Sequence, residues 1–315
     1  MKPIELLRKL DAEAKLLEHI GAALGWDQET YMPSGAIDER ADQLAYVETL
    51  AHEKATAPEI GRLLDELGST EAEPSGPGSL PTIDRAYLRV MRRKYDQATK
   101  LPAELVSEMA RATSLSQAAW VEARKHNDFK AFAPHLSRML EYNKKVAACL
   151  DPSKKPYDVL LDRFEEGGSE EQVASIFGPL RVELVALLDR IRGKPQIDDS
   201  FLRRRCPAAA QAEASAYFMR ALSYDEKRGR LDTTAHPFTT TLGESDVRIT
   251  TRYVEDFFPS SLFSTIHESG HALYEMGIDP APEYRRTSLA EASSMAVHES
   301  QSRLWENTVG RSLGF

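Results

Sequence analysis

The sequence predicts a mainly α-helical protein with one short β-hairpin beside a helix that carries a metal-binding motif. Apolar residues recur at intervals of three and four over most of residues 1–228, which is typical of helices packed on one face. Residues 229–256 are instead rich in Thr, Val, Ile and Tyr, and polar and apolar side chains alternate over 246–253. The one flexible stretch, 68–82, is rich in Gly, Pro and Ser but short, so we expect residues 1–315 to form a single, mostly helical domain.

The helices before the hairpin follow from this periodicity and from a proline. The first helix has an apolar face formed by Ile4, Leu7, Leu10, Ala14 and Leu17. Pro33 interrupts the pattern, and a second helix is expected to begin at Ser34 and to end near residue 55. Further helices are predicted at 83–99, 102–125, 129–149, 169–192 and 207–227. The apolar stripe at 180–191 is expected to pack against other elements.

The last elements that the sequence predicts are the hairpin and two helices that follow it. Gly243 and Glu244 are expected to make the hairpin turn. The segment at 258–277 is read as the next helix, with start signals at Pro259 and Ser260 and a stop at Gly277. A last helix is predicted at 287–310. An extended strand beside the helix at 258–276 is expected to border a peptide cleft and to pair with substrate backbone.

Composition excludes several classes of protein. The formal net charge of −9 and a pI near 5.5 argue against nucleic acid or an anionic membrane as the main partner. The only cysteines are Cys149 and Cys206, too few for a disulfide framework or a thiolate zinc cluster. Charged residues interrupt the N-terminal segment, and no apolar run approaches the ~18 residues of a membrane span. We therefore expect a cytoplasmic protein.

The segment "HESGH" at 267–271 is the strongest chemical signal in the chain. On a helix, His267 and His271 lie one above the other, with Cβ atoms about 5–6 Å apart, which suits two imidazole nitrogens on one zinc ion. Glu268 lies between them, within reach of a zinc-activated water. The alternative is an ordinary helix face, because so short a motif also arises by chance. The interpretation as a metal site therefore depends on finding a third ligand.

A hydrolytic zinc ion takes three protein ligands and leaves one position for water. The helix predicted at 287–310 carries three candidates for the third ligand, Glu291, His298 and Glu299. Residues 298 and 299 point about 100° apart on a helix, so at most one of them can face the metal squarely. The side-chain chemistry alone leaves the choice open between a site of three histidines and a site of two histidines and a glutamate.

Four motifs in order resemble the M32 metallocarboxypeptidases, the carboxypeptidase Taq family. They are "HPF" at 236–238, "DVRIT" at 246–250, "HESGH" at 267–271 and "HESQSRLWEN" at 298–307, and the segment "WDQETYMPSGAIDERADQLA" is also similar to that family. The resemblance implies a helical fold like that of neurolysin and angiotensin-converting enzyme. It also implies one divalent metal ion, zinc or cobalt, and removal of single residues from the free C-termini of peptides.

The same resemblance assigns roles to individual residues. His267, His271 and Glu299 are identified as the metal ligands, and Glu268 as the general base and acid. His236 and the D-x-R-x-T residues Asp246, Arg248 and Thr250 are identified as substrate-binding residues that line the cleft. As an alternative, Asp246 and Arg248 form an ion pair without a role in binding, and His236 is an ordinary loop residue. The resemblance also implies a homodimer.

The chain departs from the family pattern in one respect. The family's I-R-x-x-A-D and G-x-x-Q-D-x-H-W motifs, which are associated with the substrate carboxylate and the reacting carbonyl, do not occur in these residues. We therefore expect a shortened member with exposed apolar surface, weak metal binding and slow hydrolysis. Two alternatives remain open at this stage: an oligopeptidase that cuts internal bonds, and a helical fragment without activity.

Overall fold

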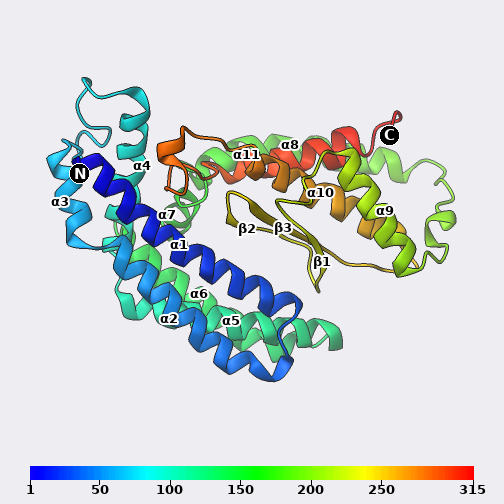
Figure 1. The fold of residues 1–315 in the computed structure, drawn as a ribbon. Helices are drawn as coiled ribbons and strands as arrows, with labels where there is room; N and C mark the ends of the chain where they lie inside the picture. Colours follow the sequence, from blue (N-terminus) through cyan, green and yellow to red (C-terminus); the bar gives the residue numbers. More distant parts are fainter.

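The computed structural model describes residues 1–315 and confirms a mainly helical chain with a small sheet (Figure 1). The α-helices are α1 (Pro3–Thr30), α2 (Ile37–Ala55), α3 (Pro58–Glu66), α4 (Thr82–Thr99), α5 (Ala103–His126), α6 (Phe129–Leu150), α7 (Pro156–Asp162), α8 (Glu170–Arg192), α9 (Ala208–Ala221), α10 (Phe258–Met276) and α11 (Met295–Arg303). Short 3₁₀ turns lie at Ser34–Ala36 (η1), Ser200–Arg203 (η2) and Pro282–Tyr284 (η3), and a π-helix, η4, lies at Leu304–Val309. None of these helices combines the length and the apolar character needed to cross a membrane.

The N-terminal helices form a layered body in which α2 packs against both α1 and α5, and α5 packs against α6. In Figure 1 this body lies to one side of the sheet, and α1 runs from it towards the strands. A second cluster joins α1, α3 and α4 to η3, with the core residues Leu7, Ile60, Leu63, Leu64, Tyr87, Leu88, Met91 and Tyr284. The short helices α3 and α7 were not predicted. Both are shorter than the windows in which helical periodicity is visible, although a proline at the first helical position marks each of them.

The sheet has three strands, β1 (Leu231–Thr233), β2 (Thr239–Gly243) and β3 (Asp246–Thr251), in the order β1-β3-β2. The antiparallel pair β2–β3 is the predicted hairpin, and the pairing is irregular between Thr241 and Gly243. β1 adds parallel to β3, with Leu231 opposite Ile249. Val247 and Ile249 are buried with Ala272 of α10, so the sheet packs directly on the helix that carries the histidines.

The helix predicted at 287–310 is shorter and less regular than expected. It begins at Met295 because Ser294 caps it, accepting a hydrogen bond from the Val297 backbone N–H at 3.1 Å. The segment before it is a loop, held where the buried Asp11 carboxylate accepts hydrogen bonds from the backbone N–H and hydroxyl of Ser288, both at 2.8 Å. The same correction applies to the helix predicted at 207–227, which ends at Ala221.

Helix α8 contradicts the expectation that its apolar stripe is packed. Its side chains are exposed along nearly the whole length, including Leu180, Leu184, Leu187 and Ile191 on one face. The helix begins with a complete capping box at Ser169, so local signals define its start. Periodicity shows which face of a helix is apolar, but it does not show whether another element covers that face.

We predict opposite stability effects for the same substitution in α8 and in the core. Leu184→Ala is expected to change the free energy of unfolding by no more than about 0.5 kcal/mol, because Leu184 is exposed. Leu88→Ala is expected to lower it by about 2–5 kcal/mol, because Leu88 is fully buried. Urea unfolding of both variants measures the difference. An equally large loss at Leu184 would show that α8 is packed in solution.

Candidate metal centre

Helix α10 brings the two histidines of the motif together. It has Pro259 near its start and its cap at Gly277, as predicted, and the imidazole rings of His267 and His271 lie 4.9 Å apart between centroids. Helix α11 crosses next to α10 and contributes Glu299. One ligating atom from each of these three residues lies within 4.8 Å of the other two. No other group of three His, Cys, Asp or Glu residues in the chain meets this spacing.

The distances between these atoms fit one metal ion. Glu299 Oε2 lies 3.3 Å from His271 Nε2 and 3.6 Å from His267 Nε2. Zinc bonds of about 2.0–2.1 Å at tetrahedral angles separate ligand atoms by roughly 3.3–3.4 Å. The side chains are therefore arranged as two imidazoles and a carboxylate around a common centre. The donor set of two nitrogens and one oxygen suits zinc and also cobalt.

A glycine within the motif permits the close crossing of α10 and α11. A Cβ atom at Gly270 would lie 2.7 Å from Ser302 Cα and 2.9 Å from the Gln301 carbonyl oxygen. Real Cβ atoms do not approach backbone this closely, so any larger residue would push the helices apart. Gly270 thus lets α11 lie close enough to present Glu299 to the two histidines.

Each histidine has a partner for its second ring nitrogen. Glu306 Oε2 lies 2.9 Å from His267 Nδ1 and accepts its hydrogen bond. His271 Nδ1 contacts His298 Nδ1, and His298 Nε2 donates to Glu275 Oε1 at 2.8 Å. A consistent assignment of protons places N–H on Nδ1 of both motif histidines. Their Nε2 lone pairs then face the metal position, as in carboxylate–histidine–zinc arrangements.

The pKa shifts at the centre favour metal binding. Burial, together with the nearby His298 and His267, lowers the pKa of His271 to about 4, so this imidazole is neutral at neutral pH. Burial alone would raise the pKa of Glu299, but hydrogen bonds from Arg303 and Ser302 outweigh it and the pKa is lowered. A neutral imidazole and an ionised carboxylate are the forms that coordinate metals.

Glu268 is buried next to the ligands and is held by the hairpin. Thr239 of β2 donates to Glu268 Oε2 at 2.6 Å, and its hydroxyl also lies 3.1 Å from the Glu268 carbonyl oxygen. Burial raises the pKa of Glu268, although the Thr239 hydrogen bond and the His267 charge oppose this. A raised pKa makes this carboxylate a better proton acceptor, which suits a group that takes and returns a proton.

A cavity of about 430 Å³ opens beside Glu268 and His267. His236 lines this cavity, and its ring packs edge-on against Trp120 with centroids 6.2 Å apart. Other residues of the lining include Phe263 and Arg303. The substrate-binding role of His236 stays a prediction, and the structure places its side chain where a substrate at the metal centre would reach it.

The three D-x-R-x-T residues lie on β3 but do not line this cavity. Arg248 donates to both oxygens of Asp246, at 2.8 and 2.7 Å, and stacks over the Trp26 ring at 4.4 Å. Thr250 is fully buried, and its hydroxyl accepts from the Phe238 N–H at 2.8 Å. Their substrate-binding roles stay predictions. These contacts show that Arg248 links the sheet to α1 through Trp26, and that Thr250 holds the "HPF" segment by a hydrogen bond.

The other two candidates for the third ligand lie elsewhere. Glu291 forms ion pairs with Lys15 and Lys94, whereas His298 contacts His271 on the side away from the metal position. Thr239 and Glu306 were not among the residues predicted to form the site. Thr239 directly follows the "HPF" motif, and Glu306 lies seven residues after Glu299, a spacing that returns to the same helix face. These positions in the sequence could have pointed to a role for the two residues.

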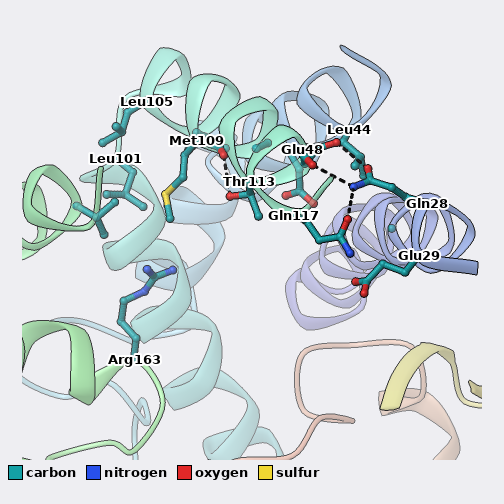
Figure 2. A pocket seen from close by; sticks show the side chains of 15 residues that line it. Gln28, Glu29, Leu44, Glu48, Leu101, Leu105, Met109, Thr113, Gln117 and Arg163 are labelled. Atoms are coloured by element: carbon teal, nitrogen blue, oxygen red, sulfur yellow. Dashed lines mark hydrogen bonds between the residues drawn. The ribbon is translucent and has the colours of Figure 1, made fainter. Parts of the chain in front are cut away.

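A different cavity, of about 410 Å³, lies between α1, α2 and α5 (Figure 2). Gln28 lines this cavity and donates to the Ser114 carbonyl oxygen at 3.1 Å and to Gln117 Oε1 at 3.3 Å. Its lining includes Leu105 and Met109 but none of the candidate ligands. This cavity is separate from the metal centre, and its acidic side chains do not form a group of three at the spacing of metal ligands.

Comparison with known proteins gives a consistent match over nearly the whole chain. The family model described as carboxypeptidase Taq (M32) metallopeptidase matches residues 6–315. The chain is 40 % identical to Thermostable carboxypeptidase 1 of Thermus thermophilus, with 98 % of this chain and 61 % of that protein aligned. It is 34 % identical to Carboxypeptidase 1 of Bacillus subtilis, over 99 % of this chain and 60 % of that protein. The chain thus spans about three fifths of the length of these relatives.

Solved structures agree with the fold. The crystal structure of BsuCP superposes with a TM-score of 0.93 at 32 % identity and covers 99 % of this chain and 61 % of its own. The M32 carboxypeptidase from Deinococcus radiodurans R1 gives a TM-score of 0.84 at 38 % identity, covering 99 % and 61 %. The helical architecture with its small sheet is therefore the one found in these carboxypeptidases.

Proposed function

We propose, from the premise that this chain belongs to the carboxypeptidase Taq (M32) metallopeptidase family, that it is a metal-dependent carboxypeptidase releasing single amino acids from peptide C-termini. One observation carries the proposal: one ligand atom from each of His267, His271 and Glu299 lies within 4.8 Å of the other two, next to the buried carboxylate of Glu268. We propose zinc as the metal, with cobalt as the alternative. A homodimer stays a prediction that follows from the family resemblance.

In the proposed mechanism, His267, His271 and Glu299 would hold the metal ion, which would supply Lewis acidity to the scissile carbonyl and lower the pKa of the attacking water. Glu268 takes the proton of that water and then delivers it to the leaving amine. Thr239 holds Glu268 Oε2, so the carboxylate keeps one orientation while the proton moves. The buried setting of Glu268 excludes bulk water and strengthens these electrostatic interactions.

The sheet suggests how a peptide is held. β2 is an edge strand, and it carries the residue that touches Glu268. A peptide that adds to this edge by main-chain hydrogen bonds would pass beside the general base. His236 and Phe263 would then contact side chains of the peptide in the adjoining cavity.

The second candidate is an oligopeptidase that cuts internal bonds. One observation favours it: Arg248, the motif arginine available for a terminal carboxylate, is paired with Asp246 on both oxygens. Specific recognition of a free C-terminus needs a cation with donors to spare, ideally in a bidentate pair.

We expect the metal-loaded chain to cleave a peptide with a free C-terminus and to leave its C-terminally amidated twin intact. The amide removes the negative charge that a carboxypeptidase recognises, but it leaves internal bonds unchanged. Mass spectrometry of the products of both peptides measures the difference. Equal cleavage of the two would favour the oligopeptidase, and a chain that takes up no zinc or cobalt on titration would exclude both enzymes.

A further inference from the structure

Arg303 joins two carboxylates that both belong to the metal centre. It lies one helical turn after Glu299 on α11, and its Nε donates to Glu299 Oε1 at 2.8 Å. Its Nη1 donates to Glu306 Oε2 at 3.2 Å. Residues 299, 303 and 306 are spaced by four and three, so all three side chains emerge from one face.

The first contact holds the oxygen of Glu299 that faces away from the histidines. Arg303 occupies Oε1, while Oε2 lies 3.3 Å from His271 Nε2 and also accepts a hydrogen bond from the Ser302 hydroxyl at 3.1 Å. A carboxylate without such a partner can rotate or bind a metal through both oxygens. With Oε1 held by the guanidinium, Glu299 is prepared to bind through one oxygen.

The second contact acts on His267. Glu306 Oε2 accepts hydrogen bonds both from Arg303 Nη1 and from His267 Nδ1. Arg311 Nη2 also donates to Glu306 Oε1 at 2.7 Å. Because Glu306 accepts the hydrogen bond of His267 Nδ1, the N–H stays on that nitrogen and Nε2 is left to bind a metal.

We propose that Arg303 is a positioning residue that fixes Glu299 as a one-oxygen ligand and, through Glu306, fixes the ring of His267. The inference rests on the proposed metal site but not on peptidase activity. Arg303 is about half exposed, at 53 % of its side chain, and exposed ion pairs add little to stability. Its removal should therefore change the metal centre and leave the fold intact.

The test uses the full chain loaded with Co²⁺, whose visible absorption reports coordination because four-coordinate cobalt absorbs more strongly than five- or six-coordinate cobalt. Arg303→Met is expected to weaken the cobalt absorption, because Glu299 becomes free to bind through both oxygens. The same variant is expected to bind zinc about 10–100-fold more weakly in competition with a chelator. Arg303→Lys keeps the charge but not the two-armed contact, so its values should lie between those of Arg303→Met and the parent chain.

Arg62 offers a matched control on α3. It also donates to two glutamates of its own helix, Glu59 and Glu66, both at 3.2 Å. Unlike Glu299 and Glu306, these two glutamates do not contact a histidine. Arg62→Met is expected to leave the cobalt spectrum and the zinc affinity unchanged. The midpoint of urea unfolding of the metal-free chain should be the same for all variants.

The outcomes separate this inference from the proposed function. Unchanged cobalt absorption and zinc affinity in Arg303→Met would overturn the role of Arg303 and leave the metal site standing. An equal change in Arg62→Met would also overturn it, because the effect would then be general to the chain. A parent chain that binds neither metal would instead overturn the proposed metal site itself.

Discussion

Replacing Glu268 by Gln is expected to leave the metal bound and to slow peptide hydrolysis by about 10²–10⁴-fold, the usual contribution of a positioned general base. Gln has nearly the same shape, and its amide oxygen can still accept the hydrogen bond from Thr239, which lies at 2.6 Å from Glu268 Oε2. The amide does not take a proton from the attacking water. The loss should therefore fall on the chemical step and not on metal binding.

The measurement is the rate of release of the terminal amino acid, with zinc content determined on the same samples. Glu29→Gln is a matched control, because Glu29 is a partly buried glutamate whose pKa is also raised by burial, and it lines the separate cavity between α1, α2 and α5 (Figure 2). That variant should keep both zinc and activity. Parental turnover in Glu268→Gln would contradict its role as the base, and loss of zinc would indicate that Glu268 is a ligand.

Losing a residue that only supports a metal ligand typically reduces metal affinity about 10–100-fold. Replacing Glu299 by Ala is expected to reduce zinc affinity by more than this. Glu299 supplies the only carboxylate oxygen within reach of both histidine Nε2 atoms, at 3.3 and 3.6 Å. Without it, two imidazoles remain, fewer than the three protein ligands that catalytic zinc sites use. Competition with a chelator of known affinity measures the change.

Substitutions of the other two candidate ligands test whether Glu299, and not Glu291 or His298, is the third ligand. Glu291→Ala is expected to leave zinc affinity unchanged, because that carboxylate is paired with Lys15 and Lys94. His298→Ala is expected to weaken zinc binding about 10–100-fold, since His298 supports His271 without facing the metal. An empty site in Glu291→Ala together with a full site in Glu299→Ala would reverse the assignment.

Much of the fold was predictable because its signals are local. The apolar periodicity of α1 and α4 to α6, the proline between α1 and α2, and the turn signals of the hairpin act over a few residues of chain. The hairpin turn itself lies at Glu244 and Ser245, one residue later than predicted, because Gly243 is the last residue of β2 and pairs with Asp246. The pairing of β1 with β3 was not predictable, because a parallel strand is joined through non-local hydrogen bonds that leave no periodic mark. The start of α11 was misplaced, because the cap that defines it is Ser294, later in the chain than the predicted start at residue 287.

The sequence by itself determined the pair of histidines and the family. His267 and His271 are neighbours in any α-helix, because residues four apart lie one above the other. Side-chain chemistry left the third ligand open among Glu291, His298 and Glu299, and the family resemblance predicted Glu299. Only the tertiary structure shows which of the three side chains lies next to both motif histidines. The crossing of α11 over Gly270 turns Glu299 towards the metal position and His298 towards His271. Which face a helix presents follows from its own residues, whereas what lies opposite that face depends on how distant segments pack.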